Sequence, residues 1–402
     1  MMYSWIMRLS PNFIRSLWFA VLCLALCVPG ARANHAFQSP ARSFFLTDYQ
    51  SGQVIASKDQ DELMPPSSMI KLMTAELTFG ALRSGKLSLG AKITVPKAAD
   101  FKSLPPDASK ICLSEGQTIT VEDALTGLIV VSGADAAITL ATAIAGGEPQ
   151  FIDLMAKRAQ EIGMDFTSFG NASGLPDVSN LSTSRELAML ATHIARTYPE
   201  YMRFFKVRRF EFVNPVAPQC RDWIKTHTIN YNRLLFIMGG AEGMKTGHTF
   251  RGGYGIVAAA ERKGRRLIGV INGLAAKNHD ALAQEGKRLL EYGYDNTYNK
   301  EIKAEVAIPV WYGQKRAVKA NTERPFTVTL DNGADMTGLK VVAMAPNRIN
   351  APIKKGDLVG LVVARLDGRD IKTENLYAAE DVPRVRFFAR IIANIQYFLT
   401  GK

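Results

Sequence analysis

The sequence contains few of the residues that build metal and redox sites. Only 4 cysteines and 5 histidines occur among its 402 residues, and they show no spacing typical of zinc ligands. It also lacks an H-E-x-x-H motif, a G-x-S-x-G motif and a P-loop. These absences exclude the metalloproteases, α/β-hydrolases and nucleotide-binding enzymes that those motifs define. We therefore expect neither a metal ion nor another cofactor.

The N-terminus has only a short apolar run. Leu17–Val28 contains 12 apolar residues, too few for a comfortable membrane span. Arg8 and Arg15 precede this run, and the small-residue segment Ala31–Ala33 follows it. This order is typical of a secretory signal peptide, so we expect residues 1–33 to be removed on export. An uncleaved anchor is the alternative.

Charge of one sign is not concentrated in any segment. The formal net charge is +12, but the basic residues are scattered and no nucleic-acid-binding motif is found, which disfavours a nucleic-acid partner. Removing residues 1–33 takes away three arginines and lowers the charge to +9. It leaves two cysteines, Cys112 and Cys220, in a compartment that permits disulfides. The sequence does not decide whether these two cysteines pair.

Helical and β-rich segments divide the rest of the chain into three parts. Helical and β-rich patterns alternate along residues 34–298, which indicates an α+β domain with an antiparallel sheet and flanking helices. Residues 299–380 form short strands separated by Asn-Gly, Pro and Gly turns, and we expect a small all-β domain there. The last twenty residues, 383–402, have helical periodicity.

Individual elements can be placed within the first of these parts. We expect two strands around a turn at Ser51-Gly52 and two more beginning near Gly253 and Arg265. Helices are expected over 122–145, with a break at Ser132-Gly133, and over 150–163, 184–196 and 280–293, the last of them stopped by Gly293.

A lysine lies in an apolar stretch directly after two prolines and two serines. In "PPSSMIKLMT", residues 65–74, the prolines suit the start of a helix. Ser68 and Lys71 are three residues apart and would share one helical face. Burial favours the neutral form of a lysine. A neutral amine beside a hydroxyl is a general base beside a nucleophile.

Because S-x-x-K is a weak pattern by itself, it needs partners elsewhere in the chain. Ser132 follows a buried helical segment, 64 residues after Ser68. A K-T-G tripeptide at Lys245–Gly247 follows 113 residues later, just before a β-rich stretch, which suits the edge of a sheet. His248 adjoins this tripeptide, and we expect the other histidines to be surface or structural residues: His35, His193, His227 and His279.

The order of these three motifs is far more specific than any one of them. With it the chain resembles the low-molecular-weight penicillin-binding proteins, the serine-type D-alanyl-D-alanine carboxypeptidases of peptidase family S11. The resemblance covers nearly all of the chain after the signal peptide. It rests on these segments: "PSSMIKLMT", "VVSGADAA", "GMDFTSFGNASGLPD", "STSREL", "NYNRLL" and "GAEGMKTGHT".

The resemblance implies the fold of the β-lactamase and transpeptidase-like enzymes, and it implies roles for the motif residues. Ser68 would attack the peptide bond between two terminal D-alanines, and Lys71 would take its proton. Ser132 would relay a proton toward the leaving amine. Lys245 would hold the substrate carboxylate and help to keep Lys71 neutral, with Thr246 and Gly247 also lining the substrate site. The N–H groups of Ser68 and His248 would form the oxyanion hole.

One position departs from the family pattern. The second motif is usually S-x-N, but Ala134 occupies its third position. This leaves open a β-lactam-binding cell-shape factor with weak activity, as well as a D,D-endopeptidase acting on crosslinks by the same chemistry. A β-lactamase is disfavoured because no Glu-x-x-Leu-Asn segment is found.

The C-terminal segment predicts a membrane partner. Apolar residues recur on one helical stripe, at Val385, Phe388, Ile392, Ile395 and Leu399. Arginines lie on the opposite side, at Arg386 and Arg390. This helix is too short and too charged to span a bilayer, so we expect it to lie on the periplasmic surface of the cytoplasmic membrane. A helix docked on the β domain is the alternative.

Overall fold

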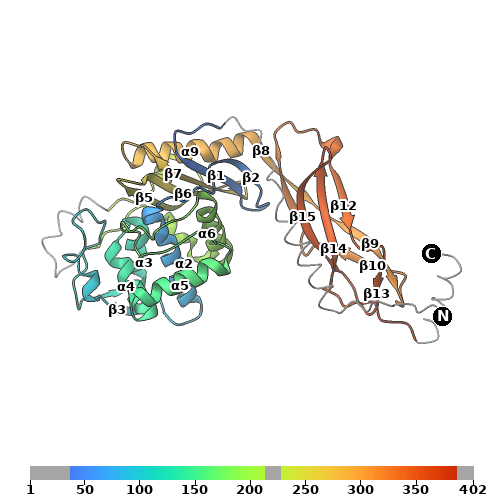
Figure 1. The fold of residues 1–402 in the computed structure, drawn as a ribbon, viewed down its shortest axis with the longest axis horizontal. Helices are drawn as coiled ribbons and strands as arrows, with labels where there is room; N and C mark the ends of the chain where they lie inside the picture. Colours follow the sequence, from blue (N-terminus) through green and yellow to red (C-terminus); the bar gives the residue numbers. More distant parts are fainter. Residues whose placement is uncertain (1–36, 213–227, 387–402) are drawn as a thin grey trace, which may run out of the picture. The chain divides into compact units, whose positions relative to one another are not determined.

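The computed structural model describes residues 37–212 and 228–386. The expected signal peptide, Cys220 and most of the expected C-terminal helix lie outside these ranges. Figure 1 shows the two described parts, an α+β part and a β-rich part. No helix within the described ranges is long and apolar enough to cross a bilayer.

Strands and helices alternate through the α+β part. Its strands are β1 (Ser43–Asp48), β2 (Val54–Lys58), β3 (Lys92–Thr94), β4 (Thr118–Thr120), β5 (Ala241–Thr249), β6 (Gly253–Arg262) and β7 (Arg265–Leu274). Its α-helices are α2 (Lys71–Arg83), α3 (Val121–Val130), α4 (Ala134–Ala145), α5 (Glu148–Glu161), α6 (Ser184–Thr197), α8 (Leu234–Ile237) and α9 (His279–Asn296). Short 3₁₀ segments are η1 (Ser67–Ile70), η2 (Lys97–Ala99) and η3 (Pro199–Lys206).

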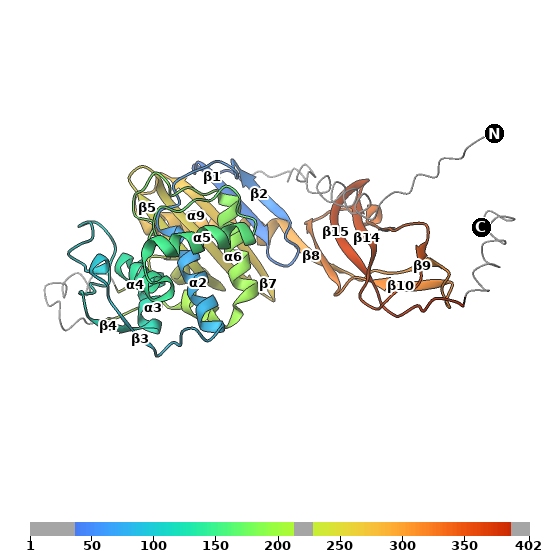
Figure 2. The same cartoon turned by 60° about the horizontal axis from the view of Figure 1, so that its bottom comes forward.

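An antiparallel sheet of five strands, in the order β2-β1-β7-β6-β5, forms the centre of this part. Alternate residues of each strand enter different cores, as the two-residue period of a strand requires. Phe45, Val257 and Ile268 face the larger core with α2 to α6, whereas Leu46 and Ile256 face α9. Figures 1 and 2 show α9 on one side of the sheet and α2 to α6 on the opposite side. Leu234 of α8 packs in the core on the side of α9. The expected antiparallel sheet with flanking helices is confirmed.

Most of the expected elements are also confirmed. The break at Ser132-Gly133 separates α3 from α4. The expected stop at Gly293 is wrong, because α9 continues to Asn296. A Cβ at position 293 would lie 2.7 Å from Leu267 and 3.0 Å from Leu46. Gly293 therefore lets the helix pack closely on the sheet and does not end it.

The β-rich part contains two further sheets. Its elements are β8 (Thr297–Ile302), β9 (Glu305–Trp311), β10 (Ala317–Asn321), β11 (Phe326–Asp331), η5 (Met336–Gly338), β12 (Lys340–Met344), β13 (Ile349–Asn350), β14 (Leu358–Leu366) and β15 (Arg369–Ala378). Six strands pair in the order β12-β14-β15-β10-β9-β13, and β11 pairs with β8. Val318, Val328, Val362 and Leu376 meet in a core of their own.

The start of the expected C-terminal helix is not helical. Val382 is fully buried and pairs with Ile353, and Arg384 forms a bridge with Gly313. The N–H of Val385 donates to the carbonyl of Tyr312. Residues 382–385 therefore belong to the β-rich part, which corrects the expected helix start at residue 383. The remaining residues of that helix, 387–402, lie outside the described ranges.

Candidate active site

The segment with Ser68 and Lys71 forms a 3₁₀ turn that leads into α2. Ser67 has a φ of 50°, which turns the chain sharply after Pro66. Ser68 lies in η1 and Lys71 is the first residue of α2, so the expected α-helix begins later than Ser67. Side chains three residues apart eclipse each other in a 3₁₀ turn. The turn therefore brings the hydroxyl and the amine closer together than an α-helix would.

Lys71 makes the contacts that a general base beside Ser68 needs. Its Nζ lies 3.0 Å from Ser68 Oγ and also donates to the carbonyl oxygen of Ser173. The side chain is only 2% exposed. Burial lowers the pKa of Lys71 to about 7, although the charge of Asp135 opposes this shift. A substantial fraction of this amine is thus neutral near pH 7.

The carbonyl that faces Lys71 is fixed by a tight loop. Asn171 Oδ1 accepts hydrogen bonds from the N–H of Ser173, the hydroxyl of Ser173 and the N–H of Leu175. Gly174 follows with a φ of 67°, and a Cβ there would lie 2.1 Å from the Ser67 carbonyl oxygen. Only glycine fits this close approach. The loop therefore locks the Ser173 carbonyl against the turn that carries Ser68.

Ser132 occupies the connection between α3 and α4, and α4 packs against α2. It has a φ of 62°, and the N–H of Gly133 bonds to the Gly127 carbonyl. The Oγ of Ser132 is buried and has no hydrogen-bond partner among the described residues. Burying a hydroxyl without a hydrogen-bond partner costs free energy unless a ligand supplies that partner. Ser132 thus presents a free donor and acceptor.

A buried carboxylate holds the connection in place. Asp135 is fully buried in the first turn of α4 and accepts hydrogen bonds from the N–H groups of Ile111 and Leu113. Burial raises its pKa, and these backbone donors act in the opposite direction. Cys112, between those two donors, is disulfide-bonded. The hydrogen bonds to Asp135 and the disulfide of Cys112 therefore fix the segment that packs beside Ser132.

The K-T-G tripeptide lies on β5, the edge strand of the central sheet, as expected. Lys245 is 1% exposed, and its Nζ donates to the Thr246 carbonyl at 2.9 Å. Burial and the neighbouring Lys71 together lower the pKa of Lys245 well below its usual value. A bound anion would restore the charge of this amine.

The comparisons with known proteins identify this arrangement. The family model for D-alanyl-D-alanine carboxypeptidases, peptidase S11, matches residues 30–276. The chain belongs to this family. A second model, for the C-terminal domain of penicillin-binding protein 5, matches residues 295–384.

Individual carboxypeptidases are similar along nearly the whole chain. The D-alanyl-D-alanine carboxypeptidase DacA of Haemophilus influenzae is 32% identical over 88% of this chain and 88% of its own. DacC of Escherichia coli is 32% identical over 94% of each chain. The crystal structure of penicillin-binding protein 5 from Haemophilus influenzae superimposes with a TM-score of 0.79, at 32% identity, over 87% of this chain and 99% of that one. The expected family and its two-part fold are confirmed.

Gly247 of this carboxypeptidase lies close to the turn that carries Ser68. A Cβ there would lie 2.9 Å from the Pro66 carbonyl oxygen and 3.0 Å from Ser67 Cβ, so the small residue makes room for this turn. Burial is the main cause of the lowered pKa of Lys71, and the charge of Lys71 contributes to the lowered pKa of Lys245. The expected help of Lys245 in keeping Lys71 neutral stays a prediction.

Sequence reasoning missed the residues that support the carboxypeptidase motifs. Asp135 could have been found, because a carboxylate within the apolar segment "VVSGADAAITL" needs a buried partner. Asn171 and Ser173 were noted only as part of a similar segment. Ser173 contacts Lys71 through its backbone carbonyl, so the pattern of side chains in the sequence does not predict this contact.

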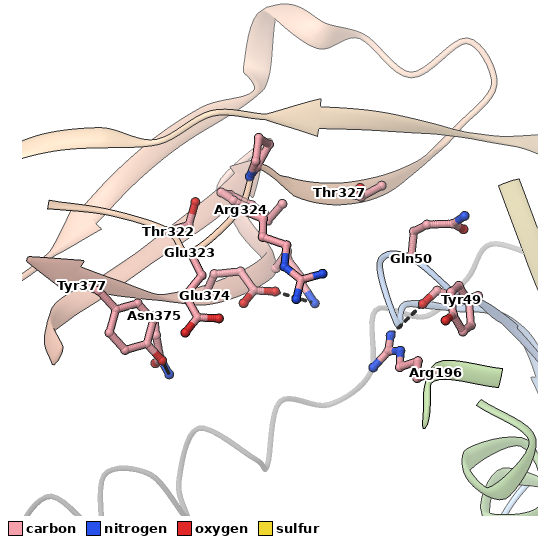
Figure 3. A pocket seen from close by; sticks show the side chains of 13 residues that line it. Tyr49, Gln50, Arg196, Thr322, Glu323, Arg324, Thr327, Glu374, Asn375 and Tyr377 are labelled. Carbon is pink, nitrogen blue, oxygen red and sulfur yellow. Dashed lines mark hydrogen bonds and ion pairs between the residues drawn. The ribbon is translucent and has the colours of Figure 1, made fainter. Parts of the chain in front are cut away.

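The carboxypeptidase also contains pockets beside and away from these motifs. A pocket of about 490 Å³ is lined by Ser67, Leu175, Val178 and Phe250, among others, and so borders the turn that carries Ser68. Figure 3 shows a different pocket, of about 710 Å³, with Arg196, Arg324 and Glu374 in its wall. This second pocket contains none of the motif residues, so we do not assign the substrate to it.

Proposed function

We propose that this serine-type D-Ala-D-Ala carboxypeptidase removes the terminal D-alanine from peptidoglycan stem pentapeptides through an acyl-enzyme on Ser68. The observation that carries this assignment is the 3.0 Å contact between Lys71 Nζ and Ser68 Oγ in a buried turn. Ser68 Oγ attacks the carbonyl carbon of the penultimate D-alanine while neutral Lys71 accepts the hydroxyl proton. The C–N bond then breaks, and water later hydrolyses the ester.

The remaining motif residues serve the same reaction. Ser132 passes a proton to the leaving amine, which its unpartnered hydroxyl suits. The buried amine of Lys245 binds the terminal carboxylate and regains its proton there. Thr246 and Gly247 continue the edge strand along the substrate, and the N–H groups of Ser68 and His248 stabilise the oxyanion. The site needs no cofactor.

Release of D-alanine from two kinds of substrate tests this function. We expect rapid release from a monomeric pentapeptide fragment and little cleavage of a crosslinked dimer, with both followed by mass spectrometry of the products. Faster cleavage of the crosslink would make the enzyme a D,D-endopeptidase. No cleavage of either substrate, together with covalent penicillin binding, would leave only the β-lactam-binding shape factor.

Covalent binding of β-lactams is part of the proposal. These compounds present a strained amide to the same serine. A solved structure of penicillin-binding protein D2 from Listeria monocytogenes, 26% identical over 65% of this chain with a TM-score of 0.56, is described in a cefotaxime-bound form. The same chemistry on Ser68 would produce a stable acyl-enzyme in this protein.

The alanine in the second motif gives a test by gain of function. In this family the third position usually carries a carboxamide, and each lost hydrogen bond is worth about 1 kcal/mol. We expect Ala134→Asn to raise the second-order rate of acylation by labelled penicillin up to about tenfold. Ala134 is buried, and its N–H donates to the Ser109 carbonyl. A lower rate at unchanged Tm would show that the site is built around alanine.

We also propose that the protein is exported and lies on the periplasmic face of the cytoplasmic membrane, held by its C-terminal segment. Residues 1–33 have the order of a signal peptide, and residues 387–402 carry most of the apolar stripe and Arg390. An amphipathic helix of this composition binds at the lipid surface through its apolar face. The β-rich part would then lie between the anchor and the catalytic residues along the chain.

Truncation tests the anchor, and the structure decides where the chain is cut. Because Val382 is fully buried and residues 382–385 pair with the β-rich part, the cut belongs after Arg386. We expect this truncated protein to leave the membrane fraction and to keep its turnover on a small peptide. Sedimentation with anionic vesicles measures the first property. If the truncated form still sediments, the anchor lies elsewhere.

A further inference from the structure

A set of four aromatic rings lies beside the Lys245 end of the site. The rings of Tyr231 and His279 stack with their centroids 5.0 Å apart and their planes only 3° from parallel. His279 meets the ring of Tyr254 edge-on at 5.4 Å, and Tyr254 contacts His248 at 4.0 Å. We call Tyr231, His279, Tyr254 and His248 the ring wall. It joins the loop before α8, the start of α9 and the strand that carries the K-T-G motif.

The outer end of the ring wall is anchored next to the second motif. The N–H of Tyr231 donates to the carbonyl of Val130, two residues before Ser132. Asn230 Nδ2 donates to the Val207 carbonyl, and Asn230 Oδ1 accepts the N–H of Asn232. These bonds fix the backbone on both sides of Tyr231. The ring wall therefore runs from the segment of Ser132 to that of Lys245.

The contacts of His279 lead through Tyr254 to His248, which lies on β5 three residues after Lys245. Burial, together with the charges of Lys245, His248 and Arg233, lowers the pKa of His279 to about 4, and Asp280 opposes this shift. A ring with this pKa is neutral near pH 7. Its Nδ1 is buried without a hydrogen-bond partner among the described residues, so no polar contact there explains a histidine. The contacts of His279 that the described structure shows are its stack on Tyr231 and its edge-on contact with Tyr254.

We infer that His279 is a positioning residue: by its stack on Tyr231 it holds an uncharged wall beside Lys245, and this wall directs the terminal carboxylate of the substrate to the lysine. This inference rests on the proposed role of Lys245. A neutral aromatic surface excludes water from the ion pair between the carboxylate and Lys245, which strengthens this pair. The wall sets preference for a free terminal carboxylate and takes no part in proton transfer.

Paired substrates test the inference on the full-length protein. The two peptides end in D-Ala-D-Ala with either a free carboxylate or a carboxamide, and kcat/KM is measured for both. We expect His279→Ala to lower kcat/KM for the free acid about fivefold to tenfold, mainly through KM, since aromatic pairs contribute energies of this order. The value for the carboxamide should change less than twofold. The preference for the acid therefore falls.

Two further variants separate positioning from simple stability. His279→Phe keeps an uncharged ring and should restore the preference to within about twofold of wild type. Asp280→Asn changes the next residue of α9, whose side chain is 76% exposed, and should leave both substrates unaffected. If His279→Ala loses both substrates equally, with a lower Tm, the histidine is only structural and the inference is overturned.

The same measurements distinguish a failure of the proposed role of Lys245. If the wild-type enzyme shows no preference for the free acid, Lys245 does not bind the carboxylate, and the inference falls with that role. If the wild type prefers the acid and Lys245→Ala removes the preference, while His279→Ala retains it, only the inference about His279 is wrong.

Discussion

Replacing Ser68 with alanine should abolish both D-alanine release and covalent labelling by penicillin. Ser68 Oγ is the hydroxyl next to the buried amine of Lys71, and no other group in the turn has this contact. Loss of a catalytic serine nucleophile costs at least about 10⁴-fold in turnover. Labelled penicillin followed by gel fluorescence, and D-alanine measured by an enzyme-coupled assay, report the two losses.

Ser67 supplies the matched control for this experiment. Its hydroxyl is adjacent in sequence, but it points to Thr249 Oγ1 at 3.2 Å. We expect Ser67→Ala to retain labelling, and the peptide that carries the label to contain modified Ser68. Label on Ser67, or turnover that survives in Ser68→Ala, would contradict the assigned nucleophile. Because both variants remove one hydroxyl from the same turn, a common loss of folding would appear in both.

The contact between Ser68 and Lys71 and the break beside Ser132 were predictable because they depend on residue types and short spacings. A lysine within "SSMIKLMT" is anomalous for an apolar segment, and its contact with Ser68 follows from a separation of three residues. The break at Ser132-Gly133 was visible because small residues interrupt two apolar helices. Local rules were sufficient in both cases.

Other features depend on contacts between distant segments, which a single sequence does not reveal. Gly293 looks like a helix stop, yet it serves the packing of α9 on β7 and β1. Gly247 makes room for Pro66 and Ser67 in the turn that carries Ser68, a contact that the sequence does not show. In both cases the neighbour that the glycine accommodates is more than 20 residues away in the sequence.

The C-terminal boundary shows a similar limit. Helical periodicity begins at Val385 in the sequence, but Val382 is buried and residues 382–385 pair with the β-rich part. An amphipathic pattern reports which residues share a face and not where the helix begins. The position of the proposed truncation therefore had to come from the structure.

The rate of acylation should depend on pH through the proton on Lys71. Only the neutral amine accepts the proton of Ser68, and burial places the pKa of Lys71 at about 7. Below that value the neutral fraction falls, so we expect the penicillin acylation rate to drop about tenfold per pH unit and to level off above about pH 8. Stopped-flow measurements at constant ionic strength between pH 5 and 9 record this limb.

Variants of the two lysines show which amine causes the fall in acylation rate at low pH, here called the limb. Lys71→Met keeps an unbranched side chain of similar size in the buried site and should not acylate measurably at any pH, with Tm near that of wild type. Lys245→Ala should weaken substrate binding but keep the pH dependence of acylation. Because this variant removes a neighbouring positive charge, the pKa of Lys71 should rise and the fall in rate should move to higher pH. Since the two amines lie close enough for the charge on Lys71 to lower the pKa of Lys245, each apparent pKa belongs to the pair. If the limb vanishes in Lys245→Ala and survives in Lys71→Met, the base is Lys245 and the assignment of Lys71 is wrong.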